Sequence, residues 1–166
     1  MLKVYKCDPD ATVPKYATRS SSCFDLHACL LPHIQLKCRH WNNDEDTLYV
    51  NEYSIITIPP MARALVPTGL IFDIPKNHSV RLHPRSGISF KFGITLMNCE
   101  GVIDEDYVDP VFVSILNLSN RPFDISHGDR ICQAELICDA RYNIVESTIA
   151  PKKKTDRGGG FGSTGL

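Results

Sequence analysis

The stretch VFVSILNL at residues 111–118 places the β-branched residues Val111, Val113 and Ile115 on every second position. A period of two is the spacing of a β-strand that buries one face and exposes the other. Seven further stretches of similar character are expected to form strands: LKVYKC (2–7), FDLHACL (24–30), HIQLKC (33–38), TLYVNEYSIITI (47–58), SVRLHP (79–84), RICQAELIC (130–138) and residues 142–149.

Turn residues separate these stretches, and no helical periodicity extends beyond a few turns. The turns include Asp8-Pro9, Pro59-Pro60, Pro75-Lys76-Asn77, Asn120-Arg121-Pro122 and His127-Gly128-Asp129. Many short strands joined by such turns predict an all-β fold of the β-sandwich, distorted barrel or jelly-roll type. Periodicity alone does not choose among these three architectures.

The length of 166 residues suits one domain with its own hydrophobic core, which we expect over residues 1–150. The formal net charge of −1 gives no overall field that would recruit nucleic acid or an anionic membrane. The seven Cys are an odd number without a C-x-x-C motif, so neither a disulfide framework nor a zinc site is expected. With no start typical of a signal peptide and no apolar run of membrane-spanning length, the sequence favours a reducing, intracellular or cytoplasmic location.

Two segments differ from the rest in composition. Residues 39–52 are polar and acidic around one Trp, which predicts the exposed tip of a hairpin. Residues 151–166 begin with Pro and three Lys and then become rich in Gly, so we expect a flexible C-terminal tail. A frayed end is the simplest interpretation, but the lone Phe161 argues against it.

Three clusters carry residue types suited to chemistry. Pro84-Arg85-Ser86-Gly87 combines a forked cationic donor, a hydroxyl and a glycine that lets a backbone N–H approach a phosphate closely. Residues 101–107 place an acidic turn between an apolar pair and an aromatic ring, where a carboxylate can deprotonate a water. Residues 157–165 offer successive backbone donors. Alone, these clusters suit an ordinary corner, a solvated turn and a frayed end; together they indicate a polyphosphate ligand.

In order and combination these segments resemble the five motifs of the homotrimeric dUTPase family. The resemblance covers nearly the whole chain, and five ordered motifs are far more specific than any single one. The stretch LVPTGL (65–70) also matches a family segment. The five motifs correspond to ATRSSSCFDLHA (17–28), PRSGI (84–88) continuing to Lys91, NCEGVIDEDY (98–107), GDRICQ (128–133) and residues 157–165.

The resemblance implies a jelly-roll-like subunit and a homotrimer with three active sites at the subunit interfaces. The implied reaction is Mg²⁺-dependent hydrolysis of dUTP to dUMP and pyrophosphate, in which water attacks the α-phosphorus. This activity keeps uracil out of DNA and supplies dUMP for dTTP synthesis. One subunit would provide the uracil pocket and a neighbour the Arg-Ser-Gly phosphate corner, while the mobile tail of residues 151–166 would close the site.

The resemblance also implies a role for each site residue. Asp104 would orient the attacking water, Asn98 with nearby main chain would read the uracil edge, and Tyr107 would pack against the deoxyribose and exclude a 2′-hydroxyl. Asp25 would support a water-ligated Mg²⁺. The other substrate-binding residues are Arg85, Ser86, Gly87 and Gln133 for the phosphates, Phe161 over the uracil, Arg157, Ser163 and Thr164 at the γ-phosphate, and Gly101 and Gly162.

Three features depart from the family pattern. Residues 36–53 look like an extra hairpin relative to short family members, and this hairpin is a decoration, an arm that stabilises the trimer, or a surface for a protein partner. Asp109, followed by Pro110, stands where the family usually has Gly, which predicts an altered local turn. Only three Gly separate Arg157 from Phe161, where the family commonly has four residues, so the reach of Arg157 to the γ-phosphate is open. Two other functions compete: a dCTP deaminase of the same fold, and a catalytically silent, nucleotide-dependent regulator that uses the hairpin.

Overall fold

The computed structural model describes residues 1–156, which form thirteen short strands and one short helix. The elements are β1 (Lys3–Lys6), β2 (Phe24–His27), β3 (Gln35–Arg39), β4 (Glu45–Tyr49), β5 (Ile55–Ile58), β6 (Arg63–Pro67), β7 (Leu70–Asp73), β8 (His78–His83), α1 (Ser86–Phe92), β9 (Ile94–Leu96), β10 (Gly101–Ile103), β11 (Phe112–Asn117), β12 (Phe123–Ser126) and β13 (Arg130–Cys138).

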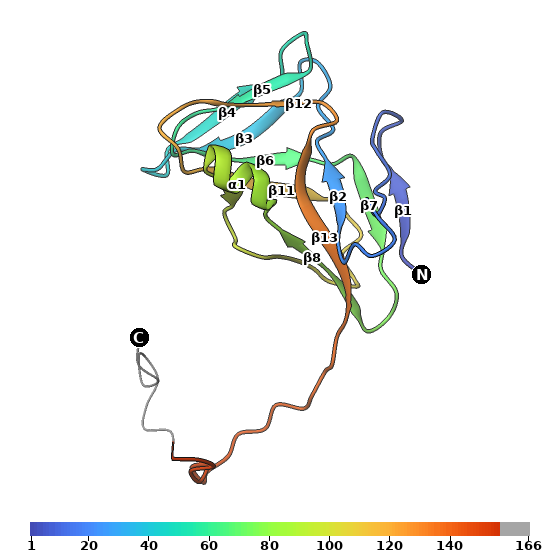
Figure 1. The fold of residues 1–166 in the computed structure, drawn as a ribbon, viewed down its shortest axis with the longest axis vertical. Helices are drawn as coiled ribbons and strands as arrows, with labels where there is room; N and C mark the ends of the chain where they lie inside the picture. The colour runs from blue at the N-terminus through green and yellow to red at the C-terminus, as the bar shows by residue number, and fades with distance from the viewer. Residues whose placement is uncertain (157–166) are drawn as a thin grey trace.

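All strand pairs are antiparallel, and the strands divide into four sheets (Figure 1). The two larger sheets have the orders β10-β8-β13-β2 and β4-β3-β6-β11-β9, and the pairs β1-β7 and β12-β5 complete the fold. Neighbours in these sheets are mostly far apart in sequence, as in a jelly roll. The all-β, jelly-roll-like prediction is confirmed, and none of the four sheets closes into a barrel within the described part of the chain.

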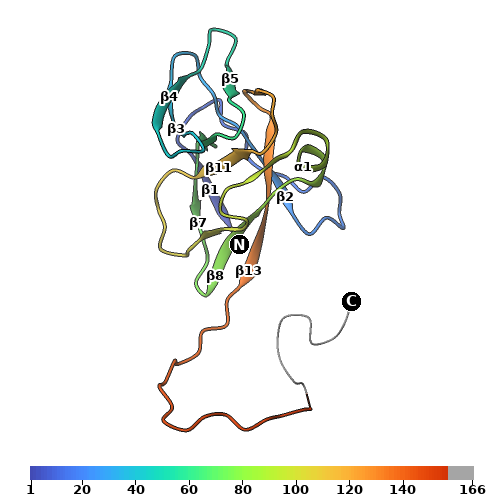
Figure 2. The same cartoon turned by 90° about the vertical axis from the view of Figure 1, so that its left-hand side faces the viewer.

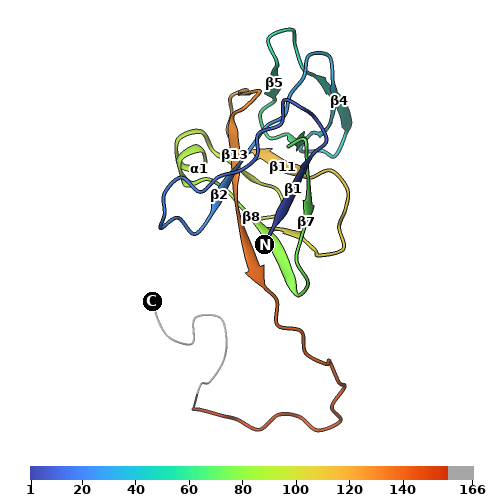
Figure 3. The ribbon, with the colours of Figure 1, turned by 90° about the vertical axis from the view of Figure 1, so that its right-hand side faces the viewer.

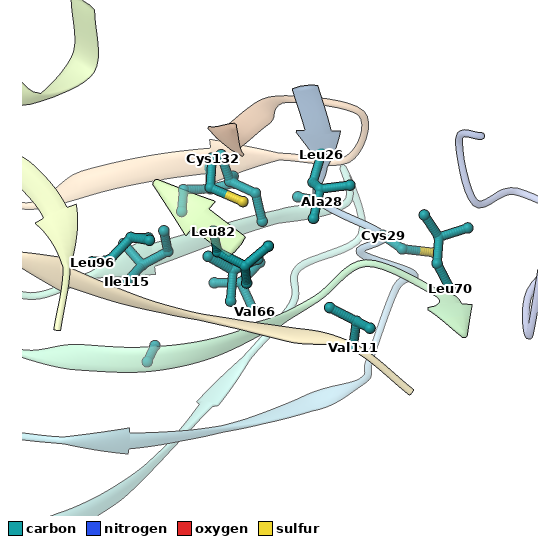
Figure 4. Packing of buried hydrophobic residues seen from close by; sticks show 14 of the residues in the cluster. Leu26, Ala28, Cys29, Val66, Leu70, Leu82, Leu96, Val111, Ile115 and Cys132 are labelled. Atoms are coloured by element: carbon teal, nitrogen blue, oxygen red, sulfur yellow. The ribbon is translucent and has the colours of Figure 1, made fainter. Parts of the chain in front are cut away.

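The hydrophobic core lies between the two larger sheets. Leu82 on β8 and Cys132 on β13 face Val66 on β6 and Ile115 on β11, and all four side chains are almost fully buried (Figure 4). Burial alternates along β11 as the period of two in its sequence predicts. Each such aliphatic side chain contributes about 1.5–3 kcal/mol when it is fully buried, so this layer holds the two sheets together.

The prediction of one strand over residues 47–58 is wrong, because this stretch contains β4 and β5, which belong to different sheets. Asn51 causes the break: its side-chain oxygen accepts hydrogen bonds from the backbone N–H groups of Tyr53 and Ile55. Ser54 then adopts a left-handed conformation with φ of 60°. An Asn that bonds to the backbone in this way forms a turn that competes with continued strand pairing.

The prediction of a strand over residues 142–149 is also wrong for the single chain. After β13 the chain leaves the body of the molecule and forms no regular element up to residue 156 (Figure 1). Its apolar residues are exposed, with Ile144 fully accessible and Tyr142 83% exposed. The strand pattern is present, but these residues pair with no strand edge among residues 1–156.

Helix α1 follows β8 after a corner at residues 84–85 and was not predicted from periodicity, because two turns are too short to reveal a period. It ends at Gly93, whose φ of 69° is the left-handed conformation that glycine adopts without strain. Among the strands, β6, β7, β9, β10 and β12 were likewise not predicted.

The segment expected to form an additional hairpin contains β3 and β4, paired from Gln35–Tyr49 to Arg39–Glu45. The hairpin joins the five-stranded sheet through β6 and lies at the end of the molecule opposite to the exit of the C-terminal segment (Figures 1 and 2). Trp41 at its tip is largely exposed. Among residues 1–156 there is no helix long and apolar enough to cross a membrane.

Candidate functional site

The first half of the site is the phosphate corner, which we define as residues 84–87. It connects β8 to α1, so it is a strand-to-helix corner rather than a strand-to-loop corner. Arg85 has an extended backbone, with φ −88° and ψ 122°, and immediately precedes the helix. Ser86 and Gly87 form the exposed first turn, where backbone N–H groups have no acceptor within the helix. A Cβ at Gly87 would meet nothing within 4 Å, so this backbone is open to an approaching ligand.

Arg85 is held in place by β2 and β13. Its Nε lies 3.3 Å from Oδ1 of Asp25, and its Nη1 donates a 2.7 Å hydrogen bond to the carbonyl of Arg130. The other Asp25 oxygen accepts from Nη1 of Arg130 at 3.2 Å. The Asp25 side chain is only 15% exposed and that of Arg85 only 20%, so this ion-pair cluster is partly shielded from water. The carboxylate thereby orients two guanidinium groups beside the corner.

Gln133 is brought to the same place by strand register. It is paired with Asp25 of β2 on one side and with His83 of β8 on the other, so the three residues form one row across the sheet. Because paired residues point to the same face, this row is continuous with the corner that follows His83. The structure therefore brings together five of the sequence-predicted site residues: Asp25, Arg85, Ser86, Gly87 and Gln133.

A hollow of about 450 Å³ borders Asp25 and is lined by residues of the N-terminal loop together with His27 and Arg130. His27 and Arg130 belong to the first and fourth motifs, and the resemblance implies no role for either. Alternation would have indicated His27, since it lies two residues after Asp25 on the same strand. Nδ1 of His27 is buried without a hydrogen-bond partner among residues 1–156. Burial lowers the pKa of His27, and the nearby Asp25 opposes this effect only in part.

The cysteines near the corner are kept as neutral thiols. Burial raises the pKa of Cys132 to about 12; the charge of Asp25 adds to this rise, and Arg85 opposes it. Burial also raises the pKa of Cys23, with contributions from Glu135 and Asp25. A nucleophilic cysteine requires a lowered pKa, so neither thiol is suited to covalent catalysis.

The second half of the site is the acidic turn, which we define as residues 104–107. It follows β10 and is closed by a 3.1 Å hydrogen bond from the Tyr107 N–H to the Asp104 carbonyl. The Asp104 side chain is exposed and makes no hydrogen bond or ion pair within residues 1–156, so its carboxylate is free to accept a proton. Glu105 differs, because its carboxylate accepts from the Asn77 N–H and lies 3.4 Å from Nη2 of Arg141.

Tyr107 presents its ring to solvent in a fixed orientation. The side chain is 40% exposed, and its hydroxyl donates a 3.0 Å hydrogen bond to the Pro110 carbonyl. Asp109, which lies between them, does not adopt a positive φ, so the turn does not use the conformational freedom that glycine would offer. An internal brace thus holds the ring of Tyr107.

Gly101 is the first residue of β10, and Asn98 lies three residues before it. Asn98 is exposed in the turn after β9, next to Cys99, whose φ of 57° is left-handed. Gly101 is buried, and a Cβ there would approach the Leu82 side chain to 3.0 Å. Glycine at this position therefore allows β10 to pack closely on β8. The tail residues that the resemblance assigns to the site lie outside the described residues. They are Arg157, Phe161, Gly162, Ser163 and Thr164.

The two halves of the site lie at opposite ends of β8. Ile103 is paired with Val80, so Asp104 follows next to Ser79, whereas Arg85 lies beyond the other end of the strand. Six residues at the rise of a strand cover about 20 Å. Figure 1 shows α1 at one end of β8 and the exit of the C-terminal segment at the other, and Figures 2 and 3 show the same separation from two sides. One chain therefore does not bring Asp104 to Arg85.

These features define an all-β, jelly-roll-like protein with a basic corner and an acidic turn on one sheet. A family model described as dUTPase matches residues 46–165. The chain is 40% identical to the deoxyuridine 5′-triphosphate nucleotidohydrolase of Finegoldia magna, over 92% of this chain and 91% of the relative. It is 36% identical to the enzyme of the same name from Nautilia profundicola, over 99% and 98%.

Solved structures share the fold at lower sequence identity. The dUTPase of Staphylococcus bacteriophage 80alpha with dUPNHPP matches with a TM-score of 0.76 and 18% identity over 100% of this chain and 99% of that chain. The dUTPase of Streptococcus mutans matches with a TM-score of 0.65 and 21% identity over 84% and 98%.

The chain belongs to the dUTPase family. It is a hydrolase that converts dUTP to dUMP, which decides against the deaminase and against the silent regulator.

Proposed function

We propose that the chain hydrolyses dUTP by attack of water on the α-phosphorus, in a homotrimer whose active sites are shared between neighbouring subunits. The observation that carries this proposal is the separation of Asp104 from Arg85 along β8. A nucleoside triphosphate cannot contact the catalytic carboxylate and the phosphate corner of one chain at once. Three chains in a threefold arrangement supply both halves at each of three interfaces, where two neighbouring chains meet.

The phosphate corner binds the triphosphate. Arg85 offers a guanidinium whose parallel N–H groups match phosphate oxygens, and the exposed backbone N–H groups of Ser86 and Gly87 add donors without a side chain in the way. Gln133 lies in the adjacent row and contributes its amide. These groups neutralise negative charge and position the α-phosphorus, which are the main tasks of a protein in phosphoryl chemistry.

The acidic turn of the neighbouring subunit performs the chemical step. Asp104 accepts a proton from the water as the water oxygen attacks the α-phosphorus, and pyrophosphate leaves on the opposite side. Asn98 and the main chain near Gly101 hydrogen-bond the uracil edge, so a base with the wrong pattern leaves buried donors unpaired. The ring of Tyr107 packs against the sugar and leaves no room for a 2′-hydroxyl.

The residues present fit a Mg²⁺ ion that is held mainly by the nucleotide. Within residues 1–156 no group of three or more His, Cys, Asp or Glu residues could hold a metal, and Asp25 is a single carboxylate already paired with two guanidinium groups. Mg²⁺ prefers oxygen ligands and keeps several waters, so phosphate oxygens and water can complete its shell, with Asp25 as outer support. When bound, the ion screens the charge of the triphosphate.

The remaining roles follow from family resemblance. Phe161 covers the uracil, Arg157, Ser163 and Thr164 reach the γ-phosphate, and the tail excludes water during the reaction. In the cell the activity keeps uracil out of DNA and supplies dUMP for dTTP synthesis.

Complementation between two inactive variants tests the shared site. Asp104→Asn removes the base from one half and Arg85→Ala removes the cation from the other, so each variant alone is expected to lose most activity. Mixed trimers formed by unfolding and refolding the two together regain intact sites, about one quarter of all sites after random mixing. The Asp104→Asn, Arg85→Ala double variant refolded with either single variant is the control and restores nothing. Failure of the two single variants to complement would contradict a shared site.

A further inference from the structure

The three consecutive acids of the acidic turn have different environments. The side chains of Asp104 and Asp106 are exposed and make no hydrogen bond or ion pair among residues 1–156. The Glu105 side chain is only 24% exposed, and both of its oxygens are engaged. Oε2 accepts from the Asn77 N–H, and Oε1 lies 3.4 Å from Nη2 of Arg141. Glu105 is therefore directed into the protein, while its neighbours are directed outward.

Asn77 connects Glu105 to the end of β13. It lies in the turn before β8, which is closed by a 3.2 Å hydrogen bond from the His78 N–H to the Pro75 carbonyl, and its own φ is 59°. Its N–H donates to Glu105, and its carbonyl accepts a 2.8 Å hydrogen bond from the Asp139 N–H. One residue thus ties the acidic turn to the first residue after β13.

Residues 139–141, which we call the tail root, are held from the other side as well. Oδ1 of Asp139 accepts from the Ser79 hydroxyl at 3.0 Å and lies 3.3 Å from Nη2 of Arg81. Beyond Arg141 the chain leaves the body of the molecule (Figure 1). These contacts fix where the C-terminal segment departs, and Glu105 links the tail root to the acidic turn through Arg141 and through Asn77.

We propose that Glu105 is a positioning residue for dUTP hydrolysis, which fixes the backbone of Asp104 and anchors the root of the C-terminal segment through Asn77 and Arg141. This inference rests on the proposed role of Asp104. The physical reason is that Glu105 is the covalent neighbour of the catalytic base, so its two contacts restrain the peptide unit that carries Asp104. A displacement of about 1 Å in a reacting group lowers a rate by as much as about 100-fold.

The chemistry of Glu105 allows its two contacts to be separated by substitution. Glu105→Gln keeps an oxygen that accepts from Asn77 but presents an amide donor or a neutral oxygen to Arg141, so the ion pair is lost. Arg141→Ala removes the same ion pair from the other side. Glu105→Ala removes both contacts. If Glu105→Ala fails to fold, the glutamine variant still tests the ion pair.

The experiment measures kcat and KM for dUTP, the melting temperature and the oligomeric state of Glu105→Ala, Glu105→Gln, Arg141→Ala and the Glu105→Gln, Arg141→Ala double variant. Kinetics are recorded well below the lowest melting temperature. Asp73→Asn is the matched control, because Asp73 forms an exposed 3.0 Å ion pair with Lys3 on the remote β1-β7 pair. We expect its kcat to be unchanged.

Glu105→Ala is expected to lower kcat by about tenfold or more with the oligomer intact, since both restraints are lost. Glu105→Gln and Arg141→Ala should each lower kcat by about threefold, the scale of a partly exposed ion pair. The kcat of the double variant should be no lower than that of Glu105→Gln, because both substitutions remove the same ion pair.

Unchanged kcat in Glu105→Ala, with only the melting temperature lowered, would show that the contacts are structural and would overturn the inference. Multiplicative losses in the double variant would also overturn it. Asp104→Asn separates this failure from that of the proposed function: full turnover there refutes the base, whereas loss there with full turnover in Glu105→Ala refutes only the positioning role.

Discussion

The phosphate corner and the acidic turn lie at the two ends of β8 and differ in how their charges are held. Arg85 is shielded and paired with Asp25, and its guanidinium is oriented by the Arg130 carbonyl. The Asp104 side chain is exposed and makes no such contact within residues 1–156. The corner is thus assembled before a ligand arrives. In the acidic turn, Glu105 and Tyr107 are held by hydrogen bonds and an ion pair, while the carboxylate of Asp104 is left free.

The difference fits the role proposed for each group. A binding cation gains from preorganisation, because orienting Arg85 in advance removes part of the entropy loss on binding. A general base must keep a lone pair available for a proton, and an ion pair would lower its basicity. The comparison predicts that removing the Asp104 carboxylate mainly alters kcat, while changes at the corner mainly alter substrate binding.

The largest effect is expected for Asp104→Asn, which keeps the shape of the side chain and removes its basicity. Turnover should fall by at least about 100-fold, the usual scale for a general base, while dUTP still binds. Steady-state kinetics and nucleotide titration measure the two quantities. Asp106→Asn in the same turn is the matched control and should keep its turnover. Equal losses in both variants would mean that the turn acts through its summed charge rather than through Asp104.

The next largest effect is expected at Arg85. Arg85→Ala removes charge-assisted hydrogen bonds and leaves Asp25 with Arg130 alone, so kcat/KM should fall by about 10- to 100-fold, mainly through KM. Arg85→Lys should recover little, because a lysine cannot make the forked contact with phosphate and also keep the Asp25 and Arg130 contacts. A lysine variant with normal KM would show that the corner needs only a positive charge.

Two variants of Tyr107 separate the effect of its ring from the effect of its hydrogen bond to Pro110. Tyr107→Ala should weaken dUTP binding and narrow the preference for dUTP over UTP, because the surface that excludes the 2′-hydroxyl is gone. Tyr107→Phe keeps the ring but loses the hydrogen bond to the Pro110 carbonyl. Its kcat/KM for dUTP should fall by about threefold, the scale of one neutral hydrogen bond. A preference that is unchanged in Tyr107→Ala would make the residue structural.

The smallest effects are expected for alanine substitutions at Gly101 and Gly87, which should differ in their effect on stability. Gly101→Ala places a Cβ against Leu82 and should lower the free energy of unfolding by about 1–3 kcal/mol. Gly87→Ala has open space and an alanine favours the helix, so stability should change by less than about 1 kcal/mol while phosphate binding weakens. Urea denaturation measures both. A Gly87→Ala variant that loses more stability than Gly101→Ala would contradict this assignment.

Sequence patterns predicted strands such as β11 and β13, but they did not predict β6, β7, β9, β10 and β12. They were wrong where a local hydrogen bond or a missing partner strand determines the structure. The Asn51 side chain divides residues 47–58 into two strands. Residues 142–149 have strand periodicity but no strand edge to join among residues 1–156. At the site, motifs identified the residue types. Strand register was needed to place Gln133 between Asp25 and His83, and no motif indicates that Glu105 turns inward.

The length of β8 has a thermodynamic consequence. In the proposed shared site, a substrate that bridges the corner of one chain and the acidic turn of the next would bind the assembled protein and not its separate subunits. By linkage, substrate must then favour assembly as strongly as assembly favours substrate. At a free concentration of about 100 times Kd, each bound dUTP adds about 2.7 kcal/mol to the stability of the assembly. Rising dUTP would therefore stabilise the proposed trimer against dissociation.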